Sequence, residues 1–396
     1  MLSRAQYTLV NFFHVLFDGL FDSIPVLLTF MALTFNNGEG AVGIAVALVT
    51  AASTFAGLGS LFVSKRLGFM RSICLMAFVY GMGFLLASFA GHIAIAAICF
   101  TFAVLGQIAF HNITFSYLTM HTERKTLGKV MSDFTAIGEI GRIPMVSFAA
   151  FAAAYSFFDL DGWRAVCLGY GAATIAIAVW LGLSIKKKTP PNDTSSANKR
   201  RFPSFTILRH RQLALAISAS MLNAFSNDRI FAFLPLLMLA KGIDPKIIGG
   251  FALGFTVGSF LGKMACGRLA DRFGSRRVFI CATLILTTLL ILLVLSQNVI
   301  CIVILALLLG MVTKGTAPVI QTIITQPVDN PDEYDDVFSI NSFLRGITNM
   351  LTPLLFGFVA SIWNMNVTYV IMAVVSVLAV VPILMMQRQT REEKIA

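Results

Sequence analysis

The chain has 396 residues, of which 57% are hydrophobic and only 12% are charged, and its formal net charge at pH 7 is +11. Soluble domains carry about a quarter charged residues, whereas the mean hydropathy of this chain is +0.82. These values exclude a soluble enzyme, a disulfide-rich secreted protein and a disordered chain. They indicate an all-α membrane protein that crosses the bilayer many times.

Apolar segments recur along the whole chain at about 20 residues each, the length that a helix needs to cross about 30 Å of hydrocarbon. Six precede a polar stretch and six follow it, which predicts twelve transmembrane helices in two pseudo-symmetric six-helix bundles. The domains are then residues 1–185, a cytosolic linker at 186–211, and 212–396 with a short cytosolic tail. The predicted spans are 6–33, 40–62, 72–90, 93–119, 127–154, 164–184, 212–240, 246–267, 278–296, 299–322, 335–361 and 367–387.

The distribution of Lys and Arg predicts the orientation of these helices. Most of the 30 basic residues fall in loops on one side, together with the linker and both termini, and the opposite loops hold only Arg164, Lys241 and Lys246. Because basic loops stay in the cytoplasm, we expect both termini there, in a bacterial inner membrane. The positive charge therefore reflects topology and contact with membrane lipid, and it predicts no nucleic-acid partner.

The two halves carry a weak internal repeat. Aligning Pro25 with Pro235 places Asp18 over Asp228. The loop after the eighth span reads G-R-L-A-D-R-F-G-S-R-R (Gly267–Arg277), and the loop after the second span holds a degenerate copy of it. This duplication indicates two related bundles.

These features together resemble the major facilitator superfamily: twelve helices, a long central loop, and the motif G-x-L-A-D-R-x-G-x-R-R between the eighth and ninth helices. The resemblance covers the whole chain. It implies two six-helix bundles around a central cavity that opens alternately to each face. The first copy of the motif departs from the family pattern, because Lys65 stands where an Asp is expected. The fifth helix also lacks the Gly-Pro motif typical of many drug antiporters in this superfamily.

Ionisable residues inside membrane helices are costly and are functional candidates by default. His14, Asp18 and Asp22 recur every four residues in the first span, so they form one stripe on the helix. Two carboxylates one turn apart repel each other when both are ionised, which favours proton binding by one of them. A His one turn away is a natural relay partner. The stripe predicts a proton-coupling site; the alternative is a polar network that fixes this helix to its neighbours.

The other membrane-embedded charges fall into two groups. Glu139 and Arg142 in the fifth span are three residues apart and can pair on one face. Lys314 and Arg345 have no acidic neighbour in their own helices. They either pair across the cavity with the acids of the first half or bind an anionic substrate, and the cost of an unpaired cation favours pairing. The possible acidic partners in the first half are Asp18, Asp22 and Glu139. Further polar candidates for the cavity are His111, Asn227, Asp228, Arg229 and Asn341.

The loop before the eleventh span reverses the charge pattern, because residues 329–336 contain five acids and no base. By pseudo-symmetry it faces the degenerate motif loop, which predicts a cytoplasmic gate with exchanged signs. The alternative is that acids at a helix start only complement the helix dipole. In this copy Lys65 or Arg66 would meet an acid such as Asp335 or Asp336. The other copy of the motif, which holds Asp271 and Arg272, would form a second gate with the usual signs.

The sequence contains no motif of a hydrolase, a metalloprotease or a nucleotide-binding protein. The six cysteines lie within or beside the predicted helices and predict neither a metal site nor a disulfide, and no cofactor is expected. We therefore expect a monomeric secondary transporter that couples protons to the efflux of a small organic molecule. The alternatives are proton-coupled uptake of an organic anion, metabolite or siderophore-like metal chelate, and a non-transporting membrane receptor or assembly factor.

Overall fold

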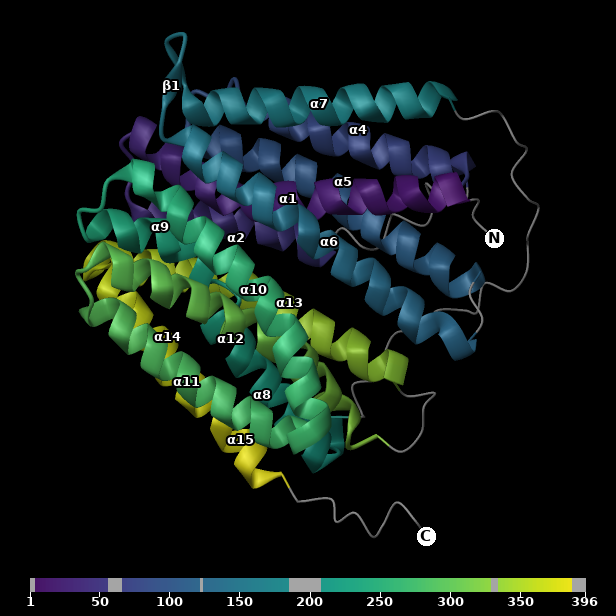
Figure 1. Cartoon of the computed structure of the whole chain (residues 1–396), viewed down its shortest axis with the longest axis vertical. Helices are drawn as coiled ribbons and strands as arrows, with labels where there is room; N and C mark the ends of the chain where they lie inside the picture. The colour runs from purple at the N-terminus through teal and green to yellow at the C-terminus, as the bar shows by residue number, and fades with distance from the viewer. Residues whose placement is uncertain (1–3, 56–65, 122–123, 185–207, 329–333, 387–396) are drawn as a thin grey trace. The chain divides into compact units, whose positions relative to one another are not determined.

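The computed structural model describes residues 4–55, 66–121, 124–184, 208–328 and 334–386, and most of these residues are helical (Figure 1). The helices of the first half are α1 (Arg4–Thr34), α2 (Glu39–Phe55), α4 (Phe69–Ala87), α5 (Ile93–His121), α6 (Arg124–Ala153) and α7 (Gly162–Ser184). Those of the second half are α8 (Arg211–Asn227), α9 (Ile230–Ala240), the 3-10 helix η3 (Pro245–Ile247), α10 (Ile248–Phe273), α11 (Ser275–Leu295), α12 (Val299–Thr325), α13 (Tyr334–Ile362), α14 (Met365–Leu378) and α15 (Val380–Met385).

Each of the twelve predicted segments corresponds to one of these helices or to a consecutive pair. Within the described ranges, nine helices are long and apolar enough to cross a membrane. The protein is therefore an integral, multi-pass helical membrane protein. The number of twelve spans and the cytoplasmic location of the termini remain predictions.

The structure differs from the prediction over residues 212–240, which form two helices instead of one. α8 ends at Asn227 and α9 begins at Ile230, so Asp228 and Arg229 lie at the break. The backbone N–H of Asp228 still donates to the carbonyl oxygen of Ala224, at 3.1 Å. Broken membrane helices are tolerated where their backbone is buried in protein or lines a cavity, so the break marks this position as a candidate binding site.

The chain divides into two compact units that each combine several segments. Unit 1 consists of Met1–Ala197, Ala232–Thr256 and Met350–Met365, and unit 2 of Asn198–Phe231, Val257–Asn349 and Asn366–Ala396. Most of the predicted linker lies outside the described residues, and the predicted domain boundaries stay a prediction.

In unit 1, α1 packs mainly against α6, and α4 packs against α5 and α7 (Figure 1). Glycines allow the first of these contacts. A Cβ atom at Gly19 would lie 2.6 Å from the carbonyl oxygen of Gly141, and a Cβ atom at Gly141 would clash with the carbonyl oxygen of Val15. Small residues of this kind let membrane helices approach closely and gain van der Waals contact. This approach brings the polar stripe of α1 against α6.

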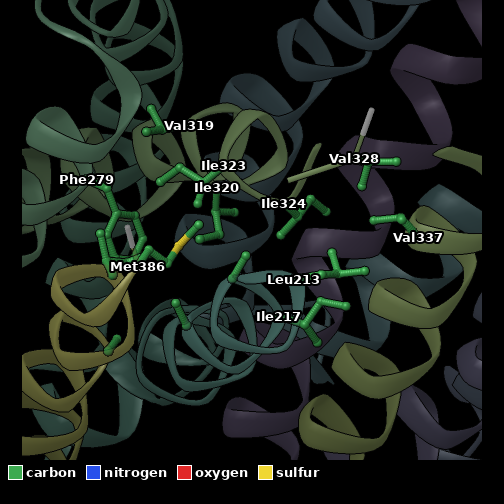
Figure 2. Packing of buried hydrophobic residues seen from close by; sticks show 14 of the residues in the cluster. Leu213, Ile217, Phe279, Val319, Ile320, Ile323, Ile324, Val328, Val337 and Met386 are labelled. Atoms are coloured by element: carbon green, nitrogen blue, oxygen red, sulfur yellow. The ribbon is translucent and has the colours of Figure 1, made fainter. Parts of the chain in front are cut away.

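The core of unit 2 is a cluster of buried aliphatic side chains from several helices (Figure 2). Leu213 and Ile217 of α8 lie beside Ile320 and Ile324 of α12. Phe279 of α11 closes another side of the cluster. This packing anchors α8 up to the break that follows Asn227.

A short antiparallel hairpin, which the sequence analysis did not predict, connects α6 with α7. Its strands are β1 (Ser156–Phe157) and β2 (Leu160–Asp161), with Phe157 paired to Leu160. The two turn residues, Phe158 and Asp159, have φ values of 50° and 64°. A two-residue loop with positive φ at both positions has the signs of a type I′ turn, which favours Asn and Gly. Asp159 tolerates such a backbone, whereas Phe158 disfavours it.

Candidate functional site

The stripe predicted on α1 lies in the interior of unit 1. His14 and Asp18 are buried, and the Nε2 atom of His14 lies 3.4 Å from the Oδ2 atom of Asp18. Asp18 and Asp22 both contact the guanidinium of Arg142, which confirms that the two carboxylates share one side of the helix.

Arg142 of α6 is the centre of this site, because its guanidinium contacts three carboxylates. Its Nη2 atom lies 3.3 Å from Oδ2 of Asp18, and its Nε atom lies 3.0 Å from Oδ2 of Asp22. Its Nη1 atom donates to Oε1 of Glu139, which is the pair predicted from the sequence. The structure adds the two aspartates of α1 to that pair. The guanidinium side chain is only 19% exposed, so little solvent screens these charges.

His111 of α5 contacts the same carboxylate from another helix. Its Nε2 atom lies 3.2 Å from Oδ1 of Asp18, and its Nδ1 atom lies 3.0 Å from the carbonyl oxygen of Gln107. A carbonyl oxygen only accepts, so Nδ1 carries a hydrogen. In the neutral ring, Nε2 then presents a lone pair to a carboxylate oxygen. A proton on Nε2 turns this contact into a charge-assisted hydrogen bond.

Aromatic rings enclose the stripe and hold α1 in place. The ring of His14 stacks on Phe134 with centroids 3.9 Å apart, and the ring of Phe17 stacks on Tyr80 at 4.6 Å and on Phe110 at 4.5 Å. The hydroxyl of Tyr80 donates to the carbonyl oxygen of Phe17 at 2.9 Å. The sequence analysis did not identify Tyr80 or Phe110. The one signal that could have identified Tyr80 is that it is a single Tyr in an apolar span.

Gly138 of α6 provides the space in which Asp18 and His14 meet. A Cβ atom at this position would lie 2.6 Å from Oδ2 of Asp18 and 2.7 Å from Nε2 of His14. Both distances are shorter than ordinary van der Waals contact, so any side chain would displace these two groups.

His14, Asp18 and His111 also meet the distance requirement of a metal site, which the sequence analysis did not predict. One ligand atom of each lies within 4.8 Å of the others. The guanidinium of Arg142 already brings a positive charge to Asp18. A divalent cation would have to bind against that charge.

A second polar cluster lies in unit 2, at the break between α8 and α9. Oδ2 of Asp228 accepts from Nη2 of Arg345 and from Nδ2 of Asn349, both at 2.8 Å. The acidic partner of Arg345 is therefore Asp228, from its own unit. The favoured expectation, pairing of Arg345 with an acid of the first half, stays a prediction.

Two further cations of unit 2 lie near the same carboxylate. Nη2 of Arg229 donates to the carbonyl oxygen of Asn349 at 3.1 Å. Lys314 of α12 lies within electrostatic reach of Asp228. Among the described residues, no ion pair within 4 Å joins Lys314 to a carboxylate. Three cations thus surround one acid.

Uncharged polar groups continue this cluster along α8. Nδ2 of Asn227 donates to Oδ1 of Asn223 at 2.8 Å and lies 3.3 Å from Oγ1 of Thr316. Asn341 of α13 is also buried in the protein interior. The candidates predicted for the second half therefore lie in one unit.

The predicted gate residues remain mostly undescribed. Asp271 and Arg272 are exposed at the end of α10, and Arg66 is exposed before α4. Lys65 and the side chains of Asp335 and Asp336 lie outside the described residues. The gate with exchanged signs therefore stays a prediction.

Comparison with known proteins shows the family. The sequence profile of the Major Facilitator Superfamily matches residues 8–262 and 216–396. A curated relative, the multidrug resistance protein MdtG of Erwinia billingiae, is 29% identical over 119 residues. This match covers 30% of the chain and only 29% of the length of that relative.

Solved transporters share the fold at low sequence identity. The bacterial homologue of the human lysosomal transporter Spinster superposes with a TM-score of 0.76 at 14% identity, covering 98% of both chains. The nucleoside transporter NupG gives 0.76 at 14% identity, covering 96% of this chain and 98% of NupG. The D-xylose-proton symporter gives 0.76 at 15% identity, covering 97% and 98%. The chain belongs to the Major Facilitator Superfamily of transporters.

Proposed function

We propose that this protein is a proton-coupled secondary transporter in which the cluster of Asp18, Asp22, Glu139, Arg142, His14 and His111 binds the coupling protons. The family makes it a transporter rather than an enzyme. The coupling ion, the direction and the substrate belong to the proposal. Its setting would be a bacterial inner membrane, with a monomeric chain and cytoplasmic termini.

The observation that carries the proposal is the excess of acids around Arg142. Three carboxylates contact one guanidinium in a buried site, so the cluster has two uncompensated negative charges when both imidazoles are neutral. Uncompensated charge inside a membrane is costly. Proton binding at His14, at His111 or at a carboxylate removes that cost. The contact between His111 and Asp18 offers a place for such a proton.

Proton binding also changes which groups Arg142 can hold. A protonated Asp22 or Asp18 attracts the guanidinium less, so the links between α1 and α6 weaken. Transport by alternating access needs two arrangements of helices whose balance a proton can shift. The shared guanidinium provides such a dependence on protonation.

We favour efflux as the direction of transport. The curated relative is named a multidrug resistance protein, and this name supports export of a small organic molecule. Uptake of an organic anion, a metabolite or a metal chelate is the second candidate, and the cations around Asp228 support an anionic substrate. A receptor or assembly factor that moves nothing would show no flux.

The test is transport by the full chain in proteoliposomes under an imposed pH gradient. We expect the gradient to accelerate substrate flux in the wild type. Asp18→Asn and Asp22→Asn should each keep downhill exchange but lose the acceleration, because an amide cannot bind the coupling proton. Asp161→Asn is the matched control, since Asp161 pairs with Arg164 at the hairpin, away from the cluster. Unchanged coupling in both stripe variants would contradict the proposal.

A further inference from the structure

We infer that unit 1 contains a binding site for a divalent transition-metal cation such as Zn²⁺, with Nε2 of His14, a carboxylate oxygen of Asp18 and Nε2 of His111 as its ligands. The inference goes beyond the proposed function, because it gives these groups a second occupant besides protons. Binding of the cation does not depend on whether transport is coupled to protons.

The distances between the three groups match those between neighbouring ligands of a metal ion. Oδ1 of Asp18 lies 3.2 Å from Nε2 of His111, and Oδ2 lies 3.4 Å from Nε2 of His14. One ligand atom of each residue lies within 4.8 Å of the other two. Zinc bonds of about 2.0–2.2 Å in a tetrahedral site place neighbouring ligand atoms about 3.3–3.5 Å apart. Small side-chain shifts are therefore enough to bring all three groups onto one ion.

The ring of His111 is oriented as metal-ligating histidines commonly are. Its Nδ1 atom donates to the carbonyl oxygen of Gln107 at 3.0 Å, so the neutral ring presents the lone pair of Nε2 to Asp18. Histidine ligands almost always donate their other ring N–H to a carbonyl oxygen, a carboxylate or water. A lone pair and a carboxylate oxygen repel each other at this distance, and a metal ion between them replaces that repulsion by two bonds.

The ring of His14 brings the second nitrogen from a buried position. Its side chain is only 2% exposed, and its Nδ1 atom has no hydrogen-bond partner among the described residues. Buried polar atoms are normally satisfied, so this ring is incompletely paired. Stacking on Phe134 fixes the plane of the ring, with Nε2 beside Asp18. Coordination of Nε2 by a metal ion offsets the cost of the unpaired Nδ1.

Gly138 leaves the two ligand atoms of α1 uncovered by a side chain from this position of α6. A Cβ atom here would lie 2.6 Å from Oδ2 of Asp18 and 2.7 Å from Nε2 of His14. Any other residue would therefore push against the very atoms that bind the ion.

The charge of Arg142 opposes a cation at Asp18, but its guanidinium has two other partners. The contact of Arg142 with Asp18 is 3.3 Å long, whereas its Nε atom lies 3.0 Å from Oδ2 of Asp22 and its Nη1 atom donates to Glu139. Arg142 thus stays paired with two carboxylates when Asp18 turns toward the metal ion. The three carboxylates and the guanidinium together carry two negative charges, which a divalent cation brings to zero.

The types of ligand select the class of ion. Imidazole nitrogens suit Zn²⁺ and neighbouring transition metals, whereas Mg²⁺ and Ca²⁺ prefer sets of oxygen ligands. Two imidazoles and one carboxylate therefore favour Zn²⁺ over Mg²⁺. Three protein ligands also leave the fourth position of a tetrahedral ion open to water or to another small molecule.

The first experiment measures Zn²⁺ binding and zinc X-ray absorption with the purified full chain, free of any affinity tag. We expect one Zn²⁺ per chain and no competition from a large excess of Mg²⁺. The absorption spectrum should show a first shell at about 2.0–2.1 Å and the outer-shell scattering of two imidazole rings. A first shell at about 2.3 Å would mean thiolate ligands, and either this result or the absence of Zn²⁺ binding would overturn the inference.

Variants connect the bound ion to the three ligands. His14→Gln and His111→Gln should each weaken the dissociation constant of Zn²⁺ at least about tenfold, since even the loss of a group that only supports a ligand costs this much. His92→Gln is the matched control and should bind Zn²⁺ as the wild type does. His92 is exposed before α5, where its Nδ1 atom accepts from the backbone N–H of Ala94. Wild-type affinity in both cluster variants would contradict the assignment.

The two proposals fail in different ways. Zn²⁺ binding at this site, together with coupling that survives in Asp18→Asn and Asp22→Asn, would refute proton coupling and leave the metal site standing. Loss of coupling in those variants, without any binding of Zn²⁺ by the wild type, would refute the metal site and leave proton coupling standing.

Discussion

At the scale of single residues, the candidate site is defined by atoms that converge from different helices. Spacing alone placed Asp18 and Asp22 on one side of α1 and placed Glu139 next to Arg142. Spacing could not show that these two pairs meet, because that contact depends on the approach of α1 to α6. His111 was a lone His in an apolar span, and only the packing of α5 brings it to Asp18.

Gly138 gives a test of this convergence. We expect Gly138→Ala to reduce proton-driven flux at least about tenfold, because its Cβ atom would displace Asp18 and His14 from their contact. Overpacking of this kind also costs about 1–3 kcal/mol of stability, so the melting temperature should fall. Flux in proteoliposomes and thermal unfolding are the two measurements.

Gly169→Ala in α7 is the control for this substitution, because a Cβ atom there meets no atom within 4 Å. It should keep both flux and melting temperature. Wild-type coupling in Gly138→Ala would show that the contact between His14 and Asp18 has no part in transport.

At the scale of elements, the spans were predictable because apolar length is a strong signal for membrane helices. The break between α8 and α9 was not predicted, since Asp228 and Arg229 interrupt an otherwise continuous apolar segment without any Gly or Pro beside them. Pro235, which does lie in this segment, is inside α9 and does not end it. Where a membrane helix breaks depends on the partners available to its polar groups.

The hairpin between α6 and α7 was missed because strands of two residues leave no alternating pattern. Its turn predicts the effect of a double substitution. Phe158→Asn combined with Asp159→Gly should stabilise the protein by about 1 kcal/mol, since positive φ costs other residues about that much. Thermal unfolding measures the gain.

Phe158→Ala separates backbone strain from the loss of an exposed aromatic ring. It keeps a residue that disfavours positive φ, so we expect no gain in melting temperature. A lower melting temperature in the double variant would show that the ring of Phe158 contributes more than the strain costs.

At the scale of the whole molecule, composition was enough to predict a polytopic helical membrane protein, whereas the transporter family was predicted from the motif at Gly267–Arg277, and the family match confirms it. The substrate class could not be read in the same way. From the sequence, Lys314 and Arg345 could either pair with an acid or bind a substrate. The structure shows that Arg345 pairs with Asp228 within unit 2.

The excess of acids around Arg142 has an electrical consequence. Each elementary charge that crosses a membrane potential of 100 mV changes the free energy by about 2.3 kcal/mol. If an anion leaves while protons enter, both movements carry positive charge inward and their electrical work adds. If anion and protons enter together, their charges oppose each other and the work largely cancels.

Sensitivity to voltage therefore reports the direction of coupling. With the potential set by a potassium gradient and valinomycin, we expect an interior-negative potential to accelerate export steeply. For an anionic substrate, flux that ignores the potential would indicate joint entry of anion and protons and would contradict export. If the proposed coupling holds, a cluster of three carboxylates around one guanidinium makes the membrane potential, alongside the pH gradient, a source of energy for this transporter.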